Sequence, residues 1–222
     1  MASGPTVVIT GASGFLGRAL AYALVERGHR VRAVVRPGSA GRVPPGAEVV
    51  EGDALDRAWL GAALEPGDTL VHLVGALHPN PFKAREFIGV DLASIAAAVA
   101  AGSARGIAHL VYVSVAHPSP VMQAYVAARR EGEALVGMSH LRATVLRPFY
   151  VTGPGRRWPL LLAPLYWLAG LVPAWRGMAR RLAPVTRGEM VAALIRAVES
   201  PPVRGARVVE VADIRSPAPS RR

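Results

Sequence analysis

The sequence contains no cysteine among its 222 residues. This absence excludes a disulfide framework, cysteine-ligated zinc, an iron–sulfur cluster and a thiol nucleophile. The six histidines occur singly, with no pair at metal-ligand spacing, so we predict no metal site. No basic segment ahead of an apolar stretch marks a secretory signal, so we expect a cytoplasmic protein.

Lysine is nearly absent as well. Lys83 is the single lysine, so arginine supplies almost all of the positive charge behind the formal net charge of +11. The planar guanidinium group suits phosphate and carboxylate ligands, which admits polyanions, nucleic acid and anionic lipid as partners. A genome that encodes arginine wherever any cation would serve is the alternative explanation. The basic residues form no helix-turn-helix or RNA-binding signature, so we predict no nucleic-acid partner.

Apolar residues are plentiful, at 51%, and the 23 glycines and 19 prolines are spread without a period, as in turns between short elements. Short β-branched runs alternate with helical patterns, which indicates a parallel sheet with helices on both faces. The predicted fold class is α/β: a doubly wound parallel sheet (Rossmann fold) of about seven strands with a small C-terminal cap. The predicted strands are Thr6 to Thr10, Val31 to Val35, Glu48 to Val50, Thr69 to Val74, His109 to Ser114, Ala143 to Leu146 and Arg207 to Val211, and the predicted helices are Phe15 to Leu24, Asp56 to Leu64 with Asp56 as N-cap, Phe87 to Ala104, Gln123 to Val136 and Arg187 to Val198.

Three glycines at spacings of three follow the first predicted strand, in the run TGASGFLG over residues 10–17. In a strand–turn–helix unit, the first glycine makes the tight turn, the second lets backbone N–H groups approach a pyrophosphate, and the third allows close helix packing. No Gly-Lys-Ser/Thr follows, which excludes a P-loop. The pattern predicts a dinucleotide site, with a glycine-rich turn that binds no ligand as the alternative. The residues expected to contact the cofactor here are Gly11, Ala12, Ser13, Gly14, Phe15, Leu16 and Gly17.

The end of the second predicted strand indicates which dinucleotide is bound. An acidic side chain at this point would bind the ribose of NAD, whereas an arginine would pair with the 2′-phosphate of NADP. The strand runs into Arg36, with Arg32 inside it and no carboxylate at its end, which favours NADP(H) and leaves NAD and a solvated arginine open. After the third strand, Asp53 and Ala54 are placed near the adenine, although Asp53 equally suits turn chemistry before a helix.

Further motifs extend this pattern along residues 6–200. In this order they resemble the short-chain dehydrogenase/reductase superfamily in its extended and atypical branches, which include NAD-dependent epimerase/dehydratase-like proteins. The resemblance implies that Val74, Gly75 and Pro148 belong to the cofactor site. It points to the atypical NAD(P)H-binding members, which include proteins similar to the NADPH-binding accessory subunit of respiratory complex I. The motifs are Thr10 to Gly17, Gly52-Asp53, Leu73-Val74-Gly75-Ala76, Val111-Tyr112-Val113-Ser114, Leu146-Arg147-Pro148 and Gly153-Pro154.

The catalytic residues of that superfamily are a serine and a Tyr-x-x-x-Lys pair. The resemblance places Ser114 and Tyr125 at the serine and the tyrosine, while Arg129 stands where lysine is usual. It implies that Tyr125 gives or takes a proton, Ser114 polarises the substrate and Arg129 orients the nicotinamide ribose. Arginine cannot be deprotonated, so it cannot relay a proton as an amine. Glu133, one turn beyond Arg129, is a candidate ion-pair partner for it, and a purely structural serine and tyrosine are the alternative.

A run of 18 residues without charge, Trp158 to Trp175, interrupts the alternation after the sixth strand. It is near the lower limit of length for a membrane-spanning helix. However, Pro164 in its centre would leave a backbone hydrogen bond unmet in lipid. We predict a lid or pocket wall for an apolar substrate, with peripheral contact to an anionic membrane and an oligomer interface as alternatives.

These predictions divide the chain into four parts. Residues 1–150 form an NAD(P)-binding Rossmann core, residues 151–185 an apolar cap or lid, residues 186–215 a helix and strand that complete the core, and residues 216–222 a frayed tail. We expect an NADP(H)-dependent oxidoreductase or epimerase-like protein that acts on a carbonyl or hydroxyl group of an apolar small molecule. The alternative is a non-catalytic NADP(H)-binding sensor or a structural or assembly subunit, with or without peripheral contact to a membrane.

Overall fold

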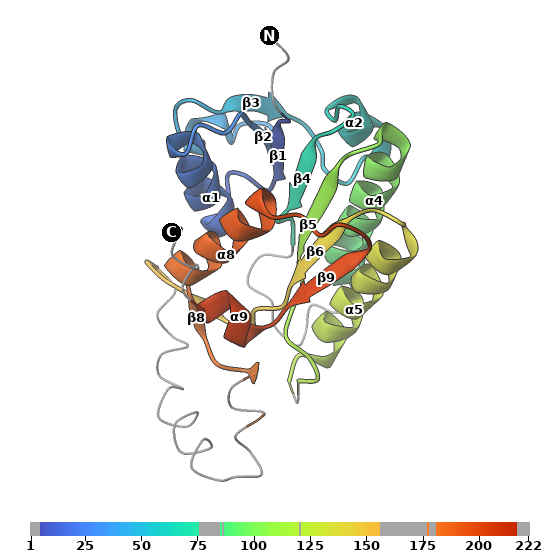
Figure 1. Cartoon of the computed structure of the whole chain (residues 1–222). Coiled ribbons are helices and arrows are strands. Elements are labelled where there is room, and N and C mark those ends of the chain that lie inside the picture. Colours follow the sequence, from blue (N-terminus) through green and yellow to red (C-terminus); the bar gives the residue numbers. More distant parts are fainter. Residues whose placement is uncertain are drawn as a thin grey trace.

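The computed structural model describes residues 5–75, 85, 87–119, 121–155, 177 and 181–216. Within them, seven strands form one sheet in the order β3-β2-β1-β4-β5-β6-β9, with every neighbouring pair parallel (Figure 1). The strand order reverses between β1 and β4, and α/β sheets bind ligands at the carboxyl ends of the strands at such a switch point. The strands are β1 Val7–Thr10, β2 Val31–Val35, β3 Glu48–Glu51, β4 Thr69–His72, β5 His109–Val113, β6 Ala143–Leu146 and β9 Ala206–Val209.

Helices cover both faces of the sheet, which confirms the doubly wound α/β fold (Figure 1). The first turn of the helix α2, Arg57–Ala62, is capped as predicted, because the Asp56 carboxylate accepts hydrogen bonds from the backbone N–H groups of Ala58 (2.8 Å) and Trp59 (3.1 Å). One face carries α1 Phe15–Glu26, α8 Arg187–Glu199 and α9 Val211–Arg215, and the other carries α2 Arg57–Ala62, α4 Ala93–Arg105 and α5 Gln123–Met138.

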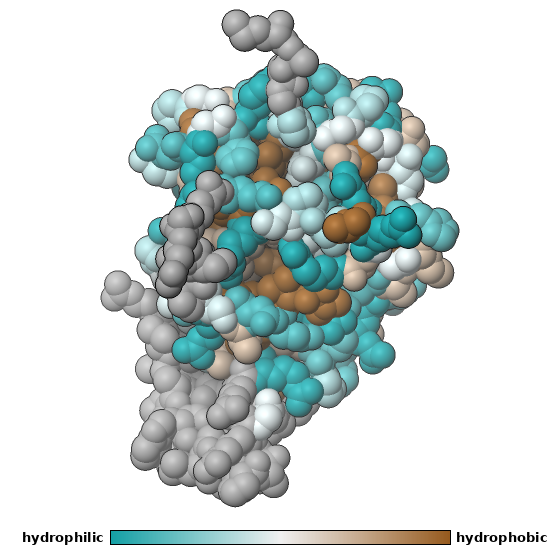
Figure 2. Space-filling model, viewed as in Figure 1, coloured by the Kyte–Doolittle hydropathy of each residue, from teal (hydrophilic) through white to brown (hydrophobic). Residues whose placement is uncertain are grey.

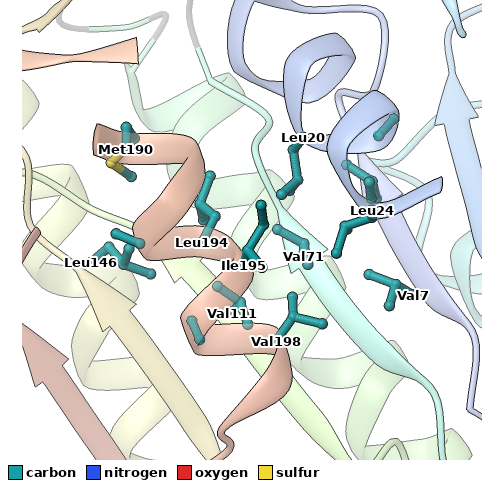
Figure 3. Close-up of a cluster of buried hydrophobic side chains, with 14 of the residues drawn as sticks. Val7, Leu20, Leu24, Val71, Val111, Leu146, Met190, Leu194, Ile195 and Val198 are labelled. Atoms are coloured by element: carbon teal, nitrogen blue, oxygen red, sulfur yellow. The ribbon is translucent and has the colours of Figure 1, made fainter. Parts of the chain in front are cut away.

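Two apolar clusters hold the helices to the sheet, because side chains along each buried strand point alternately to its two faces. In β1, Val7 and Ile9 face α1 and α8, while Val8 belongs to the cluster beneath α2 and α4. Figure 3 shows the first cluster, in which Leu20 of α1 and Leu194 of α8 point toward the strands between the two helices. The helix α8, late in the chain, is therefore part of the same core as the glycine loop.

The described surface is mostly hydrophilic on the face shown in Figure 2, with hydrophobic residues gathered in its middle, beside α8 and β9. Val208 of the edge strand β9 is among the exposed large hydrophobic residues, at 41%.

Most predicted elements are confirmed to within two residues, but two differ in kind. The helix expected over Phe87 to Ala104 opens with a π-helical turn, Phe87–Leu92, before α4 begins. The last strand ends at Val209 and not at Val211, because Glu210 caps the short helix α9. Apolar periodicity does not distinguish a π turn from an α turn, and it missed a five-residue helix directly after a strand.

A second, two-stranded parallel pair was not predicted: β7 Val151–Thr152 with β8 Val185–Thr186. Two-residue strands carry no periodic signal in the sequence. The pair brings together the two points from which the intervening chain departs and to which it returns. The predicted apolar cap, Trp158 to Trp175, falls within that interval and lies outside the described residues.

One described helical stretch, Phe87–Arg105, meets the length and hydropathy of a membrane-spanning helix, with a mean hydropathy of 1.7. It includes α4, which packs against α2 and α5 on one face of the sheet. Of its most apolar window, 44% is buried inside the protein. A core helix with this composition meets the same criterion, so length and hydropathy alone are weak evidence for a membrane span.

Candidate active site

The glycine loop joins β1 to α1 at the carboxyl edge of the sheet. Gly11 has a φ of +73°, which side-chain-bearing residues rarely adopt, and a Cβ there would lie 3.1 Å from the carbonyl carbon of Leu73. The turn is closed by a hydrogen bond from the Gly14 N–H to the Gly11 carbonyl (3.0 Å). Gly14 is the N-cap of α1 and provides no side-chain cap for the first turn. Because first-turn N–H groups need acceptors, this cradle fits a phosphate group.

Gly17 sets how closely α1 packs on that loop. A Cβ at Gly17 would lie 2.2 Å from the carbonyl oxygen of Gly11 and 2.6 Å from the Cα of Ala12, and both are backbone atoms. Ala12 is itself fully buried. The third glycine therefore has the packing role that its spacing predicts.

Gly17→Ala is expected to force α1 away from the loop, destabilising the protein by about 1–3 kcal/mol and weakening NADPH binding. Thermal unfolding and a fluorescence titration with NADPH measure the two effects. The matched control is Gly137→Ala in α5, where an added Cβ meets no atom within 4 Å and stability should rise by up to about 1 kcal/mol. Unchanged stability in Gly17→Ala would contradict the close packing described here.

The two arginines at β2 have different surroundings. Arg32 donates hydrogen bonds to the Glu48 carboxylate (2.9 Å) and to the carbonyl of Ala63 (3.1 Å), so its side chain is held within the fold. Arg36 is exposed directly after β2, and its side chain forms no hydrogen bond or ion pair with another described residue. Of the two, Arg36 is the one whose guanidinium is available to a phosphate.

Asp53 and Ala54 follow β3 at the same edge. Asp53 is exposed, and its Oδ1 accepts a hydrogen bond from the backbone N–H of Leu55 (2.9 Å). This is the turn chemistry that the sequence offered as an alternative, and it occupies one carboxylate oxygen. Ala54 is buried against the α2 and α4 face. A contact of either residue with adenine stays a prediction.

Ser114 lies just beyond the end of β5 and is buried. Its hydroxyl donates a hydrogen bond of 2.5 Å to Glu133, whose carboxylate is also bound by the guanidinium of Arg147 and lies 3.4 Å from His117. Burial would raise the pKa of Glu133, but the hydrogen bonds from Arg147 and Ser114 outweigh it and lower that pKa. Glu133 therefore pairs with Arg147 of the neighbouring strand end, and its suggested pairing with Arg129 is wrong.

Arg129 is buried beneath this edge and bound on several sides. It forms an ion pair with the fully buried Asp91 and donates a hydrogen bond to the carbonyl of Val113 (2.9 Å). Its Cζ lies 5.3 Å from the ring centroid of Tyr125 and 5.8 Å from that of Tyr112. Burial opposes the charge, but the Tyr125, Tyr112 and Asp91 side chains outweigh burial and raise the pKa of Arg129 above its ordinary value. The guanidinium is therefore a fixed positive charge.

Tyr125 stands in the first turn of α5, partly buried between two side chains. Its ring faces the guanidinium of Arg129 and meets the ring of Phe87 edge-on, with centroids 5.2 Å apart. Gly75, just beyond β4, touches the same group: a Cβ there would lie 2.3 Å from Nη2 of Arg129 and 2.9 Å from Asp91 Oδ1. The structure thus brings a predicted cofactor residue against the predicted catalytic cation.

Val74 and Pro148 also lie at the carboxyl edge, beyond β4 and β6. Val74 packs against the apolar cluster beneath α2 and α4. The carbonyl of Pro148 accepts a hydrogen bond from the backbone N–H of Ala116 (2.9 Å), which joins the chain ends leaving β5 and β6. Their positions are compatible with the predicted cofactor site, and direct contact stays a prediction.

Sequence reasoning missed a buried polar chain beneath the glycine loop. Thr10 Oγ1 lies 3.0 Å from His72 Nδ1, and His72 Nε2 lies 3.1 Å from Ser94 Oγ, which donates to the carbonyl of Asp91 (3.2 Å). Burial and the charge of Arg129 lower the pKa of His72 to about 3, so the imidazole is neutral at physiological pH. Because the Ser94 proton is committed to a carbonyl, His72 donates from Nε2 and accepts from Thr10 at Nδ1. A single carboxylate in the apolar run FIGVDLAS was the available signal for Asp91.

Sequence comparison relates this chain to known proteins. The sequence profile of the NAD(P)H-binding family matches residues 11–158, which is more than half of the chain and begins at the glycine loop. A ceramide reductase from Caulobacter vibrioides is 32% identical over 219 residues, covering 94% of this chain and 65% of the relative's length. A 3-diazoavenalumate denitrifying reductase from a Streptomyces species is 32% identical over 221 residues, covering 87% of this chain and 72% of the relative.

Solved structures share the fold at lower sequence identity. MoeE5 in complex with UDP-glucose and NAD is 22% identical, with a TM-score of 0.70 over 94% of this chain and 79% of that chain. The matched profile, the related reductases and the glycine loop of the structure agree. The chain belongs to the NAD(P)H-binding family, within the short-chain dehydrogenase/reductase superfamily.

Proposed function

We propose that the protein is an NADP(H)-dependent oxidoreductase that acts on a carbonyl or hydroxyl group of an apolar small molecule. The observation that carries this proposal is the ring of Tyr125 against the buried guanidinium of Arg129, at the edge of the sheet where Gly75 lies. A phenol beside a fixed positive charge is suited to give or take a proton at a reacting carbonyl. When bound, the dinucleotide supplies or accepts the hydride.

Three side chains have separate roles in the proposed reaction. Tyr125 is the acid/base group, and Arg129 supports it electrostatically without relaying a proton, because a guanidinium does not deprotonate. The Ser114 proton is directed to Glu133, so the serine oxygen is free to accept a hydrogen bond from a substrate hydroxyl. To polarise a carbonyl, Ser114 must rotate its proton away from Glu133.

NADP(H) is proposed over NAD(H) because of the position of Arg36. Its side chain is exposed, forms no hydrogen bond or ion pair with another described residue, and stands where the adenine ribose of a dinucleotide is expected.

Arg36→Ala is expected to weaken NADPH binding by about 10- to 100-fold, the value of a charge-assisted phosphate contact, and to leave NADH binding unchanged. Parallel fluorescence titrations with the two dinucleotides measure this. Arg42→Ala, which removes another exposed arginine from the same connection after β2, is the control. An equal loss for NADPH and NADH would contradict the assignment.

An apolar substrate is supported by two observations. The run Trp158 to Trp175 carries no charge in 18 residues, and one relative, which this chain covers over 65% of its length, is named for ceramide, a lipid. The test is NADPH oxidation with ketones and aldehydes that share a reacting group but differ in alkyl-chain length. We expect kcat/KM to rise with chain length, and a flat or falling series would contradict an apolar pocket.

A non-catalytic, dinucleotide-binding role is the second candidate. Two contacts of Arg129 favour it, the ion pair with Asp91 and the hydrogen bond to the carbonyl of Val113. Both engage the guanidinium that stands where the superfamily usually has a catalytic lysine. Tight NADPH binding without oxidation by any member of the substrate series would favour this second candidate.

A further inference from the structure

The aromatic side chain of the glycine loop lies against an arginine from a distant part of the chain. Arg187, the first residue of α8, has its Cζ 5.4 Å from the ring centroid of Phe15, the first residue of α1. Gly153 permits this approach, because a Cβ there would lie 2.9 Å from Cζ of Phe15 and 3.2 Å from Cβ of Arg187. The two helices pack side by side (Figure 3), and their first residues meet at the loop.

Arg187 carries its positive charge at the N-terminus of α8. A cation in the first turn of a helix is opposed by the helix dipole. The nearest carboxylate in sequence, Glu189, is engaged in a capping box with Thr186 and lies 3.7 Å from Arg215. Over the part of the chain that the structure describes, no carboxylate pairs with Arg187. The Phe15 ring is then weak compensation for an arginine in this position.

The first turn of α1 differs from that of α8 in receiving no side-chain cap from its N-cap residue. In α8, the Thr186 hydroxyl accepts a hydrogen bond from the Glu189 N–H (3.1 Å), so that first turn is capped from within the chain. In α1, Gly14 provides no side-chain cap. An anion bound at this turn would meet N–H groups of α1 and the guanidinium of Arg187 together. The pyrophosphate of a dinucleotide is an anion that the glycine loop of this family is built to receive.

We propose that Arg187 is a dinucleotide-binding residue whose guanidinium, held on the ring of Phe15, contacts the pyrophosphate. The proposal rests on the dinucleotide binding of the family and does not require turnover. Arg187 differs from Arg36 in what it recognises. The pyrophosphate is common to NADPH and NADH, so Arg187 contributes equally to both, whereas Arg36 acts on the 2′-phosphate alone.

The test is a fluorescence titration of the full chain with NADPH and with NADH. In Arg187→Ala and Arg187→Gln we expect both affinities to fall by about tenfold or more, by the same factor. Competition with ADP-ribose, which contains the pyrophosphate, should show the same loss, and adenosine 2′-monophosphate, which lacks it, should bind as to the parent. The matched control is Arg204→Ala, which removes an exposed arginine from the turn before β9, at the amino edge of the sheet, and should change neither affinity.

Thermal unfolding separates a binding role from a structural one. Without ligand, Arg187→Ala is expected to unfold at the same Tm as the parent or above it, because the variant removes a cation from a helix N-terminus. The rise in Tm caused by saturating NADPH should shrink, because that rise follows the affinity. A lower Tm with unchanged affinities would overturn the proposal, since Arg187 would then only pack on Phe15.

The outcomes also distinguish this proposal from the proposed function. Binding of neither dinucleotide by the parent would overturn both. Weaker binding of both dinucleotides in Arg187→Ala, in a protein that turns over no substrate, supports Arg187 and argues against the enzyme.

Discussion

Tyr125→Phe is expected to lower kcat by about 10²- to 10⁴-fold, the usual contribution of a positioned acid/base group, and to leave NADPH affinity unchanged. The substitution removes a single oxygen. The ring remains to meet Phe87, at 5.2 Å, and to face Arg129, at 5.3 Å. Turnover with a substrate identified by NADPH oxidation, measured beside an NADPH titration, separates the two quantities.

Tyr22→Phe is the matched control, because Tyr22 of α1 is 58% exposed and is not among the candidate site residues. Its turnover should equal that of the parent. If Tyr125→Phe keeps turnover within about threefold of the parent, the phenol is not the acid/base group. Tyr125 would then be a packing residue on Arg129, and the non-catalytic candidate would gain support.

Arg129→Met is expected to destabilise the protein by about 3–5 kcal/mol, because it removes the guanidinium that pairs with the buried carboxylate of Asp91. For a chain of this length, that loss lowers Tm by about 10 °C. The hydrogen bond to the carbonyl of Val113 is lost as well. Chemical denaturation and calorimetry of the free protein give both quantities without any substrate.

The double variant Asp91→Asn/Arg129→Met removes both charges and is expected to recover most of the lost stability, since a buried pair is often replaceable by neutral groups of similar size. If Arg129→Met alone unfolds within about 0.5 kcal/mol of the parent, the buried ion pair does not contribute as described.

The parts of the fold that the sequence predicted are those where one pattern decides the structure. The inner strands β1, β4, β5 and β6 are mostly apolar because both of their faces are covered, and β1 and β3 end at the turn residues Gly11 and Gly52. β7 and β8 depend on a pairing between positions more than 30 residues apart, Val151 with Val185. Two residues cannot express such a pairing as a local pattern.

For the candidate site, local sequence patterns likewise predicted some features and missed others. Helical spacing brought Tyr125, Arg129 and Glu133 onto one side of α5, and it suggested that the last two form a pair. The structure shows that each charge instead finds its partner on another element, Asp91 for Arg129 and Arg147 for Glu133. An i, i+4 rule describes only the helix itself. Which opposite charge lies nearest in a packed protein is decided by the topology of the sheet.

The positions of α8 and β9 in the sequence have a consequence for folding during synthesis. Both elements lie after residue 185, yet α8 covers the apolar side chains of Val7 and Val111, and β9 closes the edge beside β6 (Figures 1 and 3). A chain emerging from the ribosome therefore presents the apolar side chains of β1 and β5 before α8 is available to cover them. The core face beneath α8 therefore stays uncovered until residues 187–199 have been synthesised.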